Sequence, residues 1–346
     1  MRYLVEIIIN ILLILLYVIV STLENKTIST IFSIVLIILL IFSILRISIN
    51  LIKEKRKKKI IFILTNIFLI IVVLLWNYTI NNLEEIINVF GSYYISNLET
   101  DNYNSEFNEI NYKDVKILYK NNIEEAIPFL KEYIDNSKYD CERIFDEVNI
   151  SLTIKLDYDK DVFLSRFGRN MDNLSAYYID SLKTIYMYVD NSYDISNDKN
   201  NFSKILTHEI SHYYFSQFLK ENNILAKNVP VWINEGIADY ISQRIQYFRY
   251  DNSEFIPFKK LSSANDWNNI TSGKQYIQSF YSINKIISMS NETVIKNLLL
   301  ELKNSDFNIA FEKVVGEEFP TFENNIKNEM QNVKNKKANI KSNGKI

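Results

Sequence analysis

Hydrophobic residues form three long runs at the start of the chain, over residues 7–23, 28–45 and 60–76. Each run has about 17 to 18 residues, close to the shortest helix that crosses a hydrocarbon core about 30 Å thick. None of the runs shows the polar stripe of a helix on the surface of a soluble domain. The pattern therefore predicts three transmembrane helices. The predicted spans are about 4–23, 28–50 and 60–77, within an anchor of residues 1–79.

The loop between the second and third predicted spans is strongly basic. Residues 53–59 carry six Lys or Arg side chains and one Glu. Basic loops beside membrane spans stay in the cytoplasm, so we expect this loop and the N-terminus to be cytoplasmic and everything after Trp76 to be extracytoplasmic. A nucleic-acid patch is the alternative, but basic clusters next to spans mostly set topology. The sequence thus predicts a multi-pass protein of the cell membrane, with the lipid bilayer as a partner and no nucleic acid.

The chain becomes polar after residue 77 and remains so. Residues 80–110 are typical of a stalk followed by a linker, and residues 333–346, rich in Lys and Asn, of a disordered tail. Residues 111–332 between them predict a folded domain of the α+β class, rich in helices and with a small sheet near its N-terminus. Its expected elements are a helix at 123–136, strands at 150–157 and 184–189, and mainly helices from 202.

Composition narrows the class of protein. The 346 residues include six Gly and four Pro, far fewer than the roughly 24 and 17 of average usage, which favours long helices over a β-sandwich with many tight turns. The single cysteine, Cys141, excludes a disulfide framework and a four-thiolate zinc site. We expect it to be a small buried residue. A net charge of -2 argues against a general nucleic-acid binder.

The two histidines of the chain lie four residues apart. His208 and His212 belong to the sequence His-Glu-x-x-His, in which Glu209 follows the first histidine. On a helix, positions i and i+4 share one face, so both imidazoles can reach a single metal ion. Glu209 would then lie beside the ion without binding it, where it can act on a water molecule. The alternative is a surface helix with two histidines at this spacing by chance.

A second motif supplies candidates for a third ligand, which a catalytic zinc site needs besides one open position. The sequence from Pro230 to Tyr240 reads PVWINEGIADY. Proline suits the start of a helix, and Glu235 and Asp239 are four residues apart, hence on one face. An exposed helical carboxylate is the alternative interpretation of Asp239 taken alone.

Together the segments HEISH and WINEGIADY resemble the gluzincin metallopeptidases, and most closely the peptidase MA-like group. The resemblance extends over about residues 110–330 and implies a thermolysin-like catalytic domain with one Zn²⁺ per chain. It implies Glu235 as the third zinc ligand and Glu209 as general base and acid. It also implies that Asn234 and Asp239 hydrogen-bond the outer nitrogens of the two histidines.

The same resemblance implies two features of substrate binding. Tyr276, in the segment GKQYIQSF, would donate its hydroxyl to the oxyanion, with Tyr281 and Tyr250 as rivals. The predicted strand at 184–189 would be the edge strand that pairs with an extended peptide. The Gly-x-Met-x-Asn signature of the related aminopeptidases is absent, so exopeptidase activity is not supported.

These features predict a membrane-anchored zinc metallopeptidase that hydrolyses peptide bonds of proteins or peptides on the extracytoplasmic side. One alternative is a catalytically silent zinc-binding surface or sensor domain with the same fold. Another is an intramembrane metalloprotease, disfavoured by the polar residues around the histidines. The last is an unrelated helical domain without metal.

Overall fold

The computed structural model describes residues 107–165, 175–245 and 254–343, together with some positions between Leu64 and Leu75. The chain divides into two units, residues 1–94 and 95–346. In the first unit the described positions are helical, and all except Ile70 are exposed. The second unit contains the elements described below.

No helix in the described part of the chain is both long and apolar enough to cross a membrane. This finding overturns the expected fold class with its three-helix anchor, and with it the expected multi-pass location. Long helices such as α9 (Phe202–Glu221) and α15 (Phe319–Asn343) are interrupted by charged side chains. The predicted spans 4–23 and 28–50, most of 60–77, the basic loop 53–59 and residues 80–106 lie outside the described residues.

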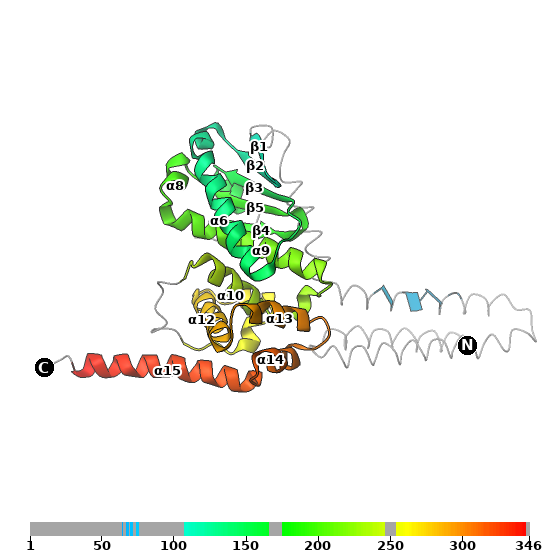
Figure 1. Ribbon diagram of the computed structural model, residues 1–346, viewed down its shortest axis with the longest axis vertical. Coiled ribbons are helices and arrows are strands. Elements are labelled where there is room, and N and C mark those ends of the chain that lie inside the picture. Colours follow the sequence, from blue (N-terminus) through cyan, green and yellow to red (C-terminus); the bar gives the residue numbers. More distant parts are fainter. Residues whose placement is uncertain are drawn as a thin grey trace, which may run out of the picture. The chain divides into compact units, whose positions relative to one another are not determined.

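A five-stranded mixed sheet forms the first layer of the second unit (Figure 1). Its strand order is β1-β2-β3-β5-β4. The three central strands run parallel, and each edge strand pairs antiparallel with its neighbour. The strands are β1 (Asn108–Tyr112), β2 (Val115–Tyr119), β3 (Leu152–Asp157), β4 (Ala176–Ile179) and β5 (Thr184–Tyr188).

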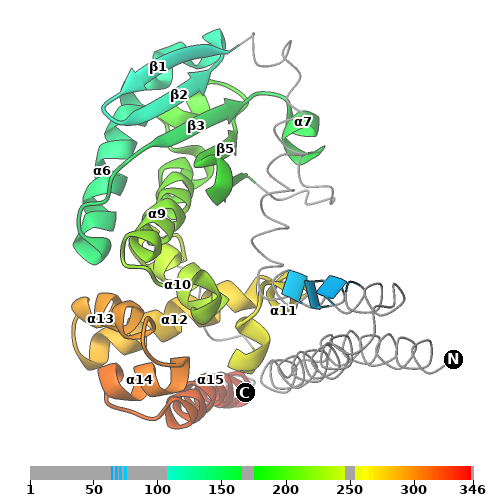
Figure 2. The ribbon, with the colours of Figure 1, turned by 90° about the vertical axis from the view of Figure 1, so that its right-hand side faces the viewer.

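Alternation of side chains gives the sheet two different faces. Ile154 of β3 and Ile185 of β5 belong to the main core, against which α6 (Ile127–Phe145) and α9 pack. Tyr186 and Tyr177 lie in a separate aromatic cluster with Phe163 of α7 (Lys160–Ser165). Figure 2 shows α6 and α9 on one side of the sheet and α7 on the other. Strands β3 and β5, in the interior of the sheet, are accordingly buried on both faces over most of their length.

The structure corrects three expected elements. Residues 108–110, expected to belong to a linker, form β1 together with residues 111 and 112, because the segment pairs with β2 in a hairpin. The helix expected at 123–136 is a 3-10 turn at Asn121–Ala126 followed by the longer α6. The strand expected at the edge is β5, but β4 pairs along its outer side, so β5 is internal.

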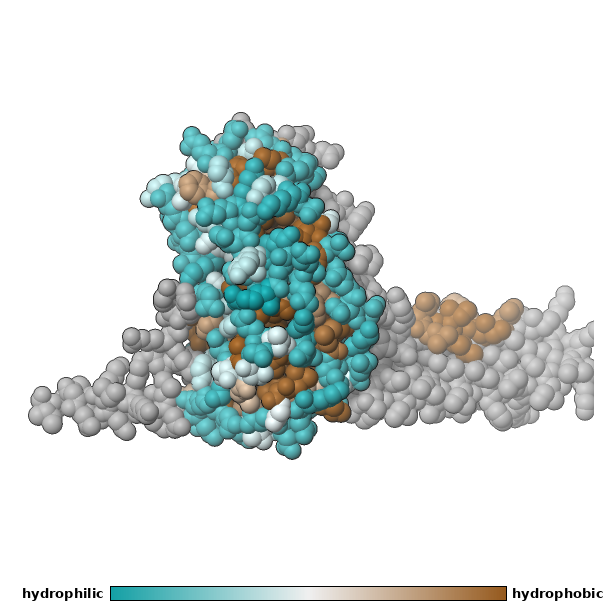
Figure 3. Space-filling view, in the orientation of Figure 1, coloured by the Kyte–Doolittle hydropathy of each residue, from teal (hydrophilic) through white to brown (hydrophobic). Residues whose placement is uncertain are grey.

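Helices make up the C-terminal half of the unit. In Figure 1, α10 and α12 lie side by side next to the sheet layer, and the chain continues through α13, α14 and α15. Helical backbone continues to Asn343, where the sequence predicts a disordered tail from 333. On the face in Figure 3 the described surface of this unit is mostly hydrophilic, with hydrophobic residues in small patches. The remaining helices are α8 (Ser192–Ser196), α10 (Val231–Ser242), α11 (Ala264–Asn268), α12 (Lys274–Met289), α13 (Thr293–Glu301) and α14 (Phe307–Val315), and the short 3-10 turns are Asp180–Leu182, Lys199–Asn201, Ala226–Asn228 and Phe258–Leu261.

Candidate metal centre

Helix α9, which carries both histidines, begins in an unusual turn. Asp198, Asn200 and Asn201 all have positive φ angles of 49° to 59°. The carboxylate of Asp198 accepts a 2.6 Å hydrogen bond from the backbone N–H of Ser203, a donor that the helix itself leaves unpaired. The residue at the N-cap position, Asn201, does not cap the helix with its side chain. Asp198 does so from farther upstream.

Polar contacts hold α9 against α6. Ser137 and Thr207 share a 2.7 Å hydrogen bond between their hydroxyls, and the thiol of Cys141 lies 3.5 Å from the hydroxyl of Ser211. Cys141 is fully buried, as the sequence predicts. Burial raises the pKa of its thiol to about 12, so it stays protonated near neutral pH. Thr207 and Ser211, which make these contacts, directly precede the two histidines in the sequence.

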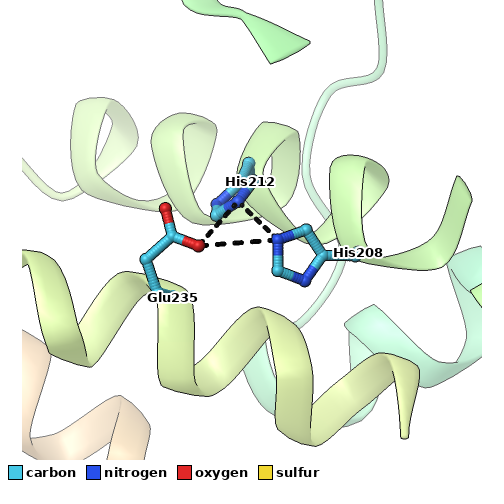
Figure 4. A group of neighbouring side chains, drawn as sticks. All are labelled: His208, His212 and Glu235. Atoms are coloured by element: carbon cyan, nitrogen blue, oxygen red, sulfur yellow. Dashed lines mark hydrogen bonds and ion pairs between the residues drawn. The ribbon is translucent and has the colours of Figure 1, made fainter. Parts of the chain in front are cut away.

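Three side chains from two helices converge at one point (Figure 4). His208 Nε2 lies 3.1 Å from His212 Nε2. Glu235 Oε2, from α10, lies 3.5 Å from His208 Nε2 and 3.7 Å from His212 Nε2. In Figure 4 the carboxylate and both imidazoles point toward one another. Three candidate ligand atoms, two from α9 and one from α10, therefore form a compact triangle.

This triangle fits a zinc ion. Nitrogen and oxygen ligands about 2.0 to 2.2 Å from zinc lie about 3.3 to 3.6 Å apart in a tetrahedron, close to the three distances given above. Two imidazoles and one carboxylate are also a ligand set found in catalytic zinc sites. Within the described residues, this is the group of His, Cys, Asp and Glu side chains close enough to hold an ion.

Each histidine has a polar partner at its outer nitrogen. Asp239 Oδ1 lies 2.9 Å from His208 Nδ1, and Asn234 Oδ1 lies 3.1 Å from His212 Nδ1. Both partners come from α10, as does Glu235. Such contacts fix the ring direction and leave Nε2 free to bind an ion. The structure thus links the residues singled out in HEISH and NEGIAD, apart from Glu209, through pairwise contacts with the two histidines.

The electrostatics of the centre favour positive charge. Burial and Arg244 lower the pKa of His208, but Asp239 and Glu235 outweigh them and raise it to about 9. Burial raises the pKa of Glu235, but the two histidines outweigh it and lower the value to about 2. The negative charge that attracts protons to this site also attracts a metal cation.

Glu209 follows His208 on α9 and is buried, with 7% of its surface exposed. Burial lowers the pKa of Arg244, but Asp239 and then Glu209 raise it above its usual value, so Glu209 lies within electrostatic reach of the guanidinium. With Glu235, three carboxylates against one guanidinium leave a formal charge of −2 when both imidazoles are neutral. A divalent cation neutralises that charge.

Tyr276 lies near the centre but outside the ligand triangle. Its ring packs edge-on against Trp267, with centroids 5.1 Å apart, and the Arg244 guanidinium carbon lies 5.3 Å from its centroid. Burial and then the charge of Glu235 raise the pKa of its hydroxyl, which therefore keeps its proton. Its rival Tyr281 donates a hydrogen bond to Glu329 on α15. The other rival, Tyr250, lies outside the described residues.

Arg244 is a charged residue of the centre that the sequence analysis missed. It follows the end of α10 and pairs with Asp239, whose side chain is completely buried. A buried aspartate requires a cationic partner, so the arginine five residues downstream of Asp239 is a candidate that the sequence itself offers. The turn that directs Arg244 back to Asp239 depends on Gln243 with φ 53°, and glutamine gives little indication of that conformation.

Gly236 allows α10 and α12 to approach closely behind the ligand. A Cβ atom at this position would lie 2.7 Å from the carbonyl oxygen of Ser279 and 2.7 Å from Ile283 Cγ1. Such distances are shorter than van der Waals contact, so only glycine fits without movement of the backbone. Glu235 is thereby fixed on a helix that α12 supports directly.

Two comparisons with known proteins bear on this centre. Residues 172–310 match the model of a family described as "Putative zinc dependent peptidase (DUF5700)". That range contains α9 and α10 completely. The chain is also 28% identical over 134 residues to the "Uncharacterized protein YhcO" of Bacillus subtilis (strain 168). The aligned stretch covers 38% of this chain and 42% of that relative. The chain therefore spans less than half the length of this relative.

Proposed function

We propose that this protein is a zinc-dependent peptidase that hydrolyses peptide bonds in proteins or peptides. The observation that carries the proposal is the triangle of His208, His212 and Glu235, whose donor atoms lie at distances suited to zinc. The match of residues 172–310 to the family model described above also supports it. The substrate is the partner that this reaction requires.

His208, His212 and Glu235 would hold one zinc ion per chain and leave a coordination position open for the reaction. Zinc bound there would supply Lewis-acid chemistry: it would polarise the carbonyl to be cleaved and lower the pKa of a bound water toward neutrality. Asp239 and Asn234 hold the two imidazoles in the orientation that binding requires.

Glu209 is the general base and acid of the proposed reaction. Its carboxylate takes a proton from the attacking water and passes it to the nitrogen of the leaving amine. Proton transfer of this kind contributes typically about 10²- to 10⁴-fold in rate. Because Glu209 follows His208 on α9, it would lie next to the ion without being one of its ligands.

Tyr276 is proposed to stabilise the oxyanion. Its hydroxyl carries a proton and can donate a hydrogen bond to the carbonyl oxygen as negative charge develops there. Arg244 and Trp267 pack against the ring, which favours one orientation of the side chain. Loss of one such donor costs about 10²- to 10³-fold in kcat in well-studied hydrolases.

The test compares the full chain with Glu209→Gln and His208→Ala, first for zinc content and then for cleavage of a peptide library. Glu209→Gln should keep its zinc and lose hydrolysis, because only the proton acceptor is removed. His208→Ala should lose both. Undiminished hydrolysis by Glu209→Gln would refute the assignment of the base. A wild-type protein that binds zinc and cleaves no peptide would leave a silent zinc-binding domain.

A further inference from the structure

Arg244 reaches back to the metal centre from beyond the end of α10. The helix ends at Ser242, and Gln243 adopts a left-handed conformation with φ 53° and ψ 25°. This turn directs the guanidinium to Asp239, where Nε and Nη2 each lie 2.9 Å from Oδ1. Asp239 Oδ1 also lies 2.9 Å from His208 Nδ1. One carboxylate oxygen therefore contacts three nitrogens.

Asp239 depends strongly on this contact. Its side chain has no exposed surface, and within the described structure its Oδ2 has no hydrogen-bond partner. A buried carboxylate is costly unless a cation pairs with it. A histidine that binds zinc is neutral, so it can donate a hydrogen bond to Asp239 but cannot balance its charge. Arg244 is charged at every pH at which the protein is folded, and it supplies that balance.

The same guanidinium also contacts Tyr276. Its carbon lies 5.3 Å from the ring centroid, within the range of a cation–π interaction. Trp267 packs edge-on against that ring. Arg244 is thus the side chain that connects the partner of His208 with the tyrosine next to the site.

We propose that Arg244 is a positioning residue of the metal centre, which holds Asp239 against His208 and fixes Tyr276 beside it. The inference rests on the proposed function in that it takes zinc as the bound ion. Lysine cannot replace arginine fully here, because a compact ammonium lacks the planar group that pairs with a carboxylate and packs on a ring at once.

The test measures metal binding in the full chain by competition with a chelator, without reference to activity. Arg244→Met should weaken zinc affinity by about 10- to 100-fold, the usual effect of losing a group that orients a ligand. Arg244→Lys keeps the charge, so its zinc affinity should lie between that of the wild type and that of Arg244→Met. The visible absorption spectrum of the cobalt-substituted protein should change in both variants, because it reports the geometry of the ligands.

The matched control is Arg143→Met. Arg143 Nε lies 2.9 Å from Glu292 Oε2, and Glu292 Oε1 accepts a 2.6 Å hydrogen bond from Tyr240 of α10. This arrangement also joins an arginine, a carboxylate and a tyrosine, and it involves α10 through Tyr240, but it includes no proposed ligand. The control should leave zinc affinity and the cobalt spectrum unchanged. An equal loss of affinity in the control would show that any disturbance of α10 has this effect, and would overturn the inference.

Other outcomes separate this inference from the proposed function. Wild-type zinc affinity and an unaltered cobalt spectrum in a folded Arg244→Met protein would overturn the inference alone. If that variant fails to fold, the same two measurements on Arg244→Lys decide in the same way. Weakened binding in the Arg244 variants, with no peptide cleaved by the wild type, would support the inference and refute the peptidase. Absence of zinc binding by the wild type would overturn both.

Discussion

The side-chain oxygen of Asn234 lies 3.1 Å from Nδ1 of His212, although the two residues belong to different helices. The next residue along α10, Glu235, approaches the Nε2 atom of the same imidazole. Helix α10 therefore supplies both a candidate ligand and the group that orients another ligand. The geometry of the centre is set by how α10 packs against α9, and the histidine motif alone does not determine it.

Replacement of Asn234 should weaken metal binding without removing a ligand. Asn234→Ala deletes the acceptor at Nδ1 of His212, so the imidazole loses its fixed orientation and tautomer. We expect zinc affinity to fall by about 10-fold or more in chelator competition. Asn284→Ala is the control, because among the described residues the Asn284 amide donates its hydrogen bond to the backbone carbonyl of Phe280, away from the ligands. Equal affinities for the wild type and Asn234→Ala would contradict the orienting role.

Zinc should stabilise the folded protein, because its three ligands come together only in the native state. At a free zinc concentration 100 times Kd, binding contributes about 2.7 kcal/mol to the free energy of unfolding. This corresponds to a rise in Tm of about 5 to 10 °C for a domain of this size. Differential scanning calorimetry with zinc and with a chelator measures the change. His212→Ala should show no such rise, and the same rise in this variant would place the ion elsewhere.

Gly236→Ala should destabilise the protein, although alanine is more favourable than glycine inside a helix by about 1 kcal/mol. The added Cβ would collide with the Ser279 carbonyl and with Ile283 on α12. Overpacking of this kind costs about 1 to 3 kcal/mol, which exceeds the gain in helix propensity. Urea unfolding gives the sign directly. A more stable Gly236→Ala protein would mean that α12 does not approach as closely as described.

Local features of the site could be predicted from the sequence. The spacing of His208 and His212 defines a helix face without reference to the rest of the fold, and the spacing of Glu235 and Asp239 does the same for the second helix. Contacts that depend on tertiary structure could not be predicted. Arg244 reaches Asp239 only because Gln243 is left-handed, a conformation that its side chain does not indicate.

The parts of the fold that the sequence does not predict also depend on tertiary contacts. Strand β1 has the polar sequence NEINY, and it is a strand because β2 pairs with it in register from Asn108 to Tyr112. Strand β4 is four residues long and too short for a periodic signal, so the sequence does not reveal the strand that covers the outer side of β5. Hydrophobicity alone produced the expected membrane anchor, whereas the described helices contain no span.

Asp180 should make the stability of the protein depend on pH. Its Oδ1 accepts hydrogen bonds from Tyr178 of β4 and from Ser216 and Lys220 of α9, so it fastens the turn between β4 and β5 to the histidine helix. Burial raises the pKa of this carboxyl, but Lys220 and Ser216 outweigh it and lower the pKa below its usual 3.8. A lowered pKa in the folded state stabilises the protein above about pH 4, and this contribution is lost as pH falls through the folded value.

Asp180→Asn removes the charge and keeps the shape of the side chain. Because the carboxylate is about half exposed, solvent screening limits the expected loss at pH 7 to about 0.5 to 1 kcal/mol. The difference from the wild type should shrink at pH 3, where the wild-type carboxylate becomes protonated in part. Urea unfolding of both proteins at the two pH values measures it. A difference of the same size at pH 3 and pH 7 would show that the charge of Asp180 contributes nothing to holding the hairpin on α9.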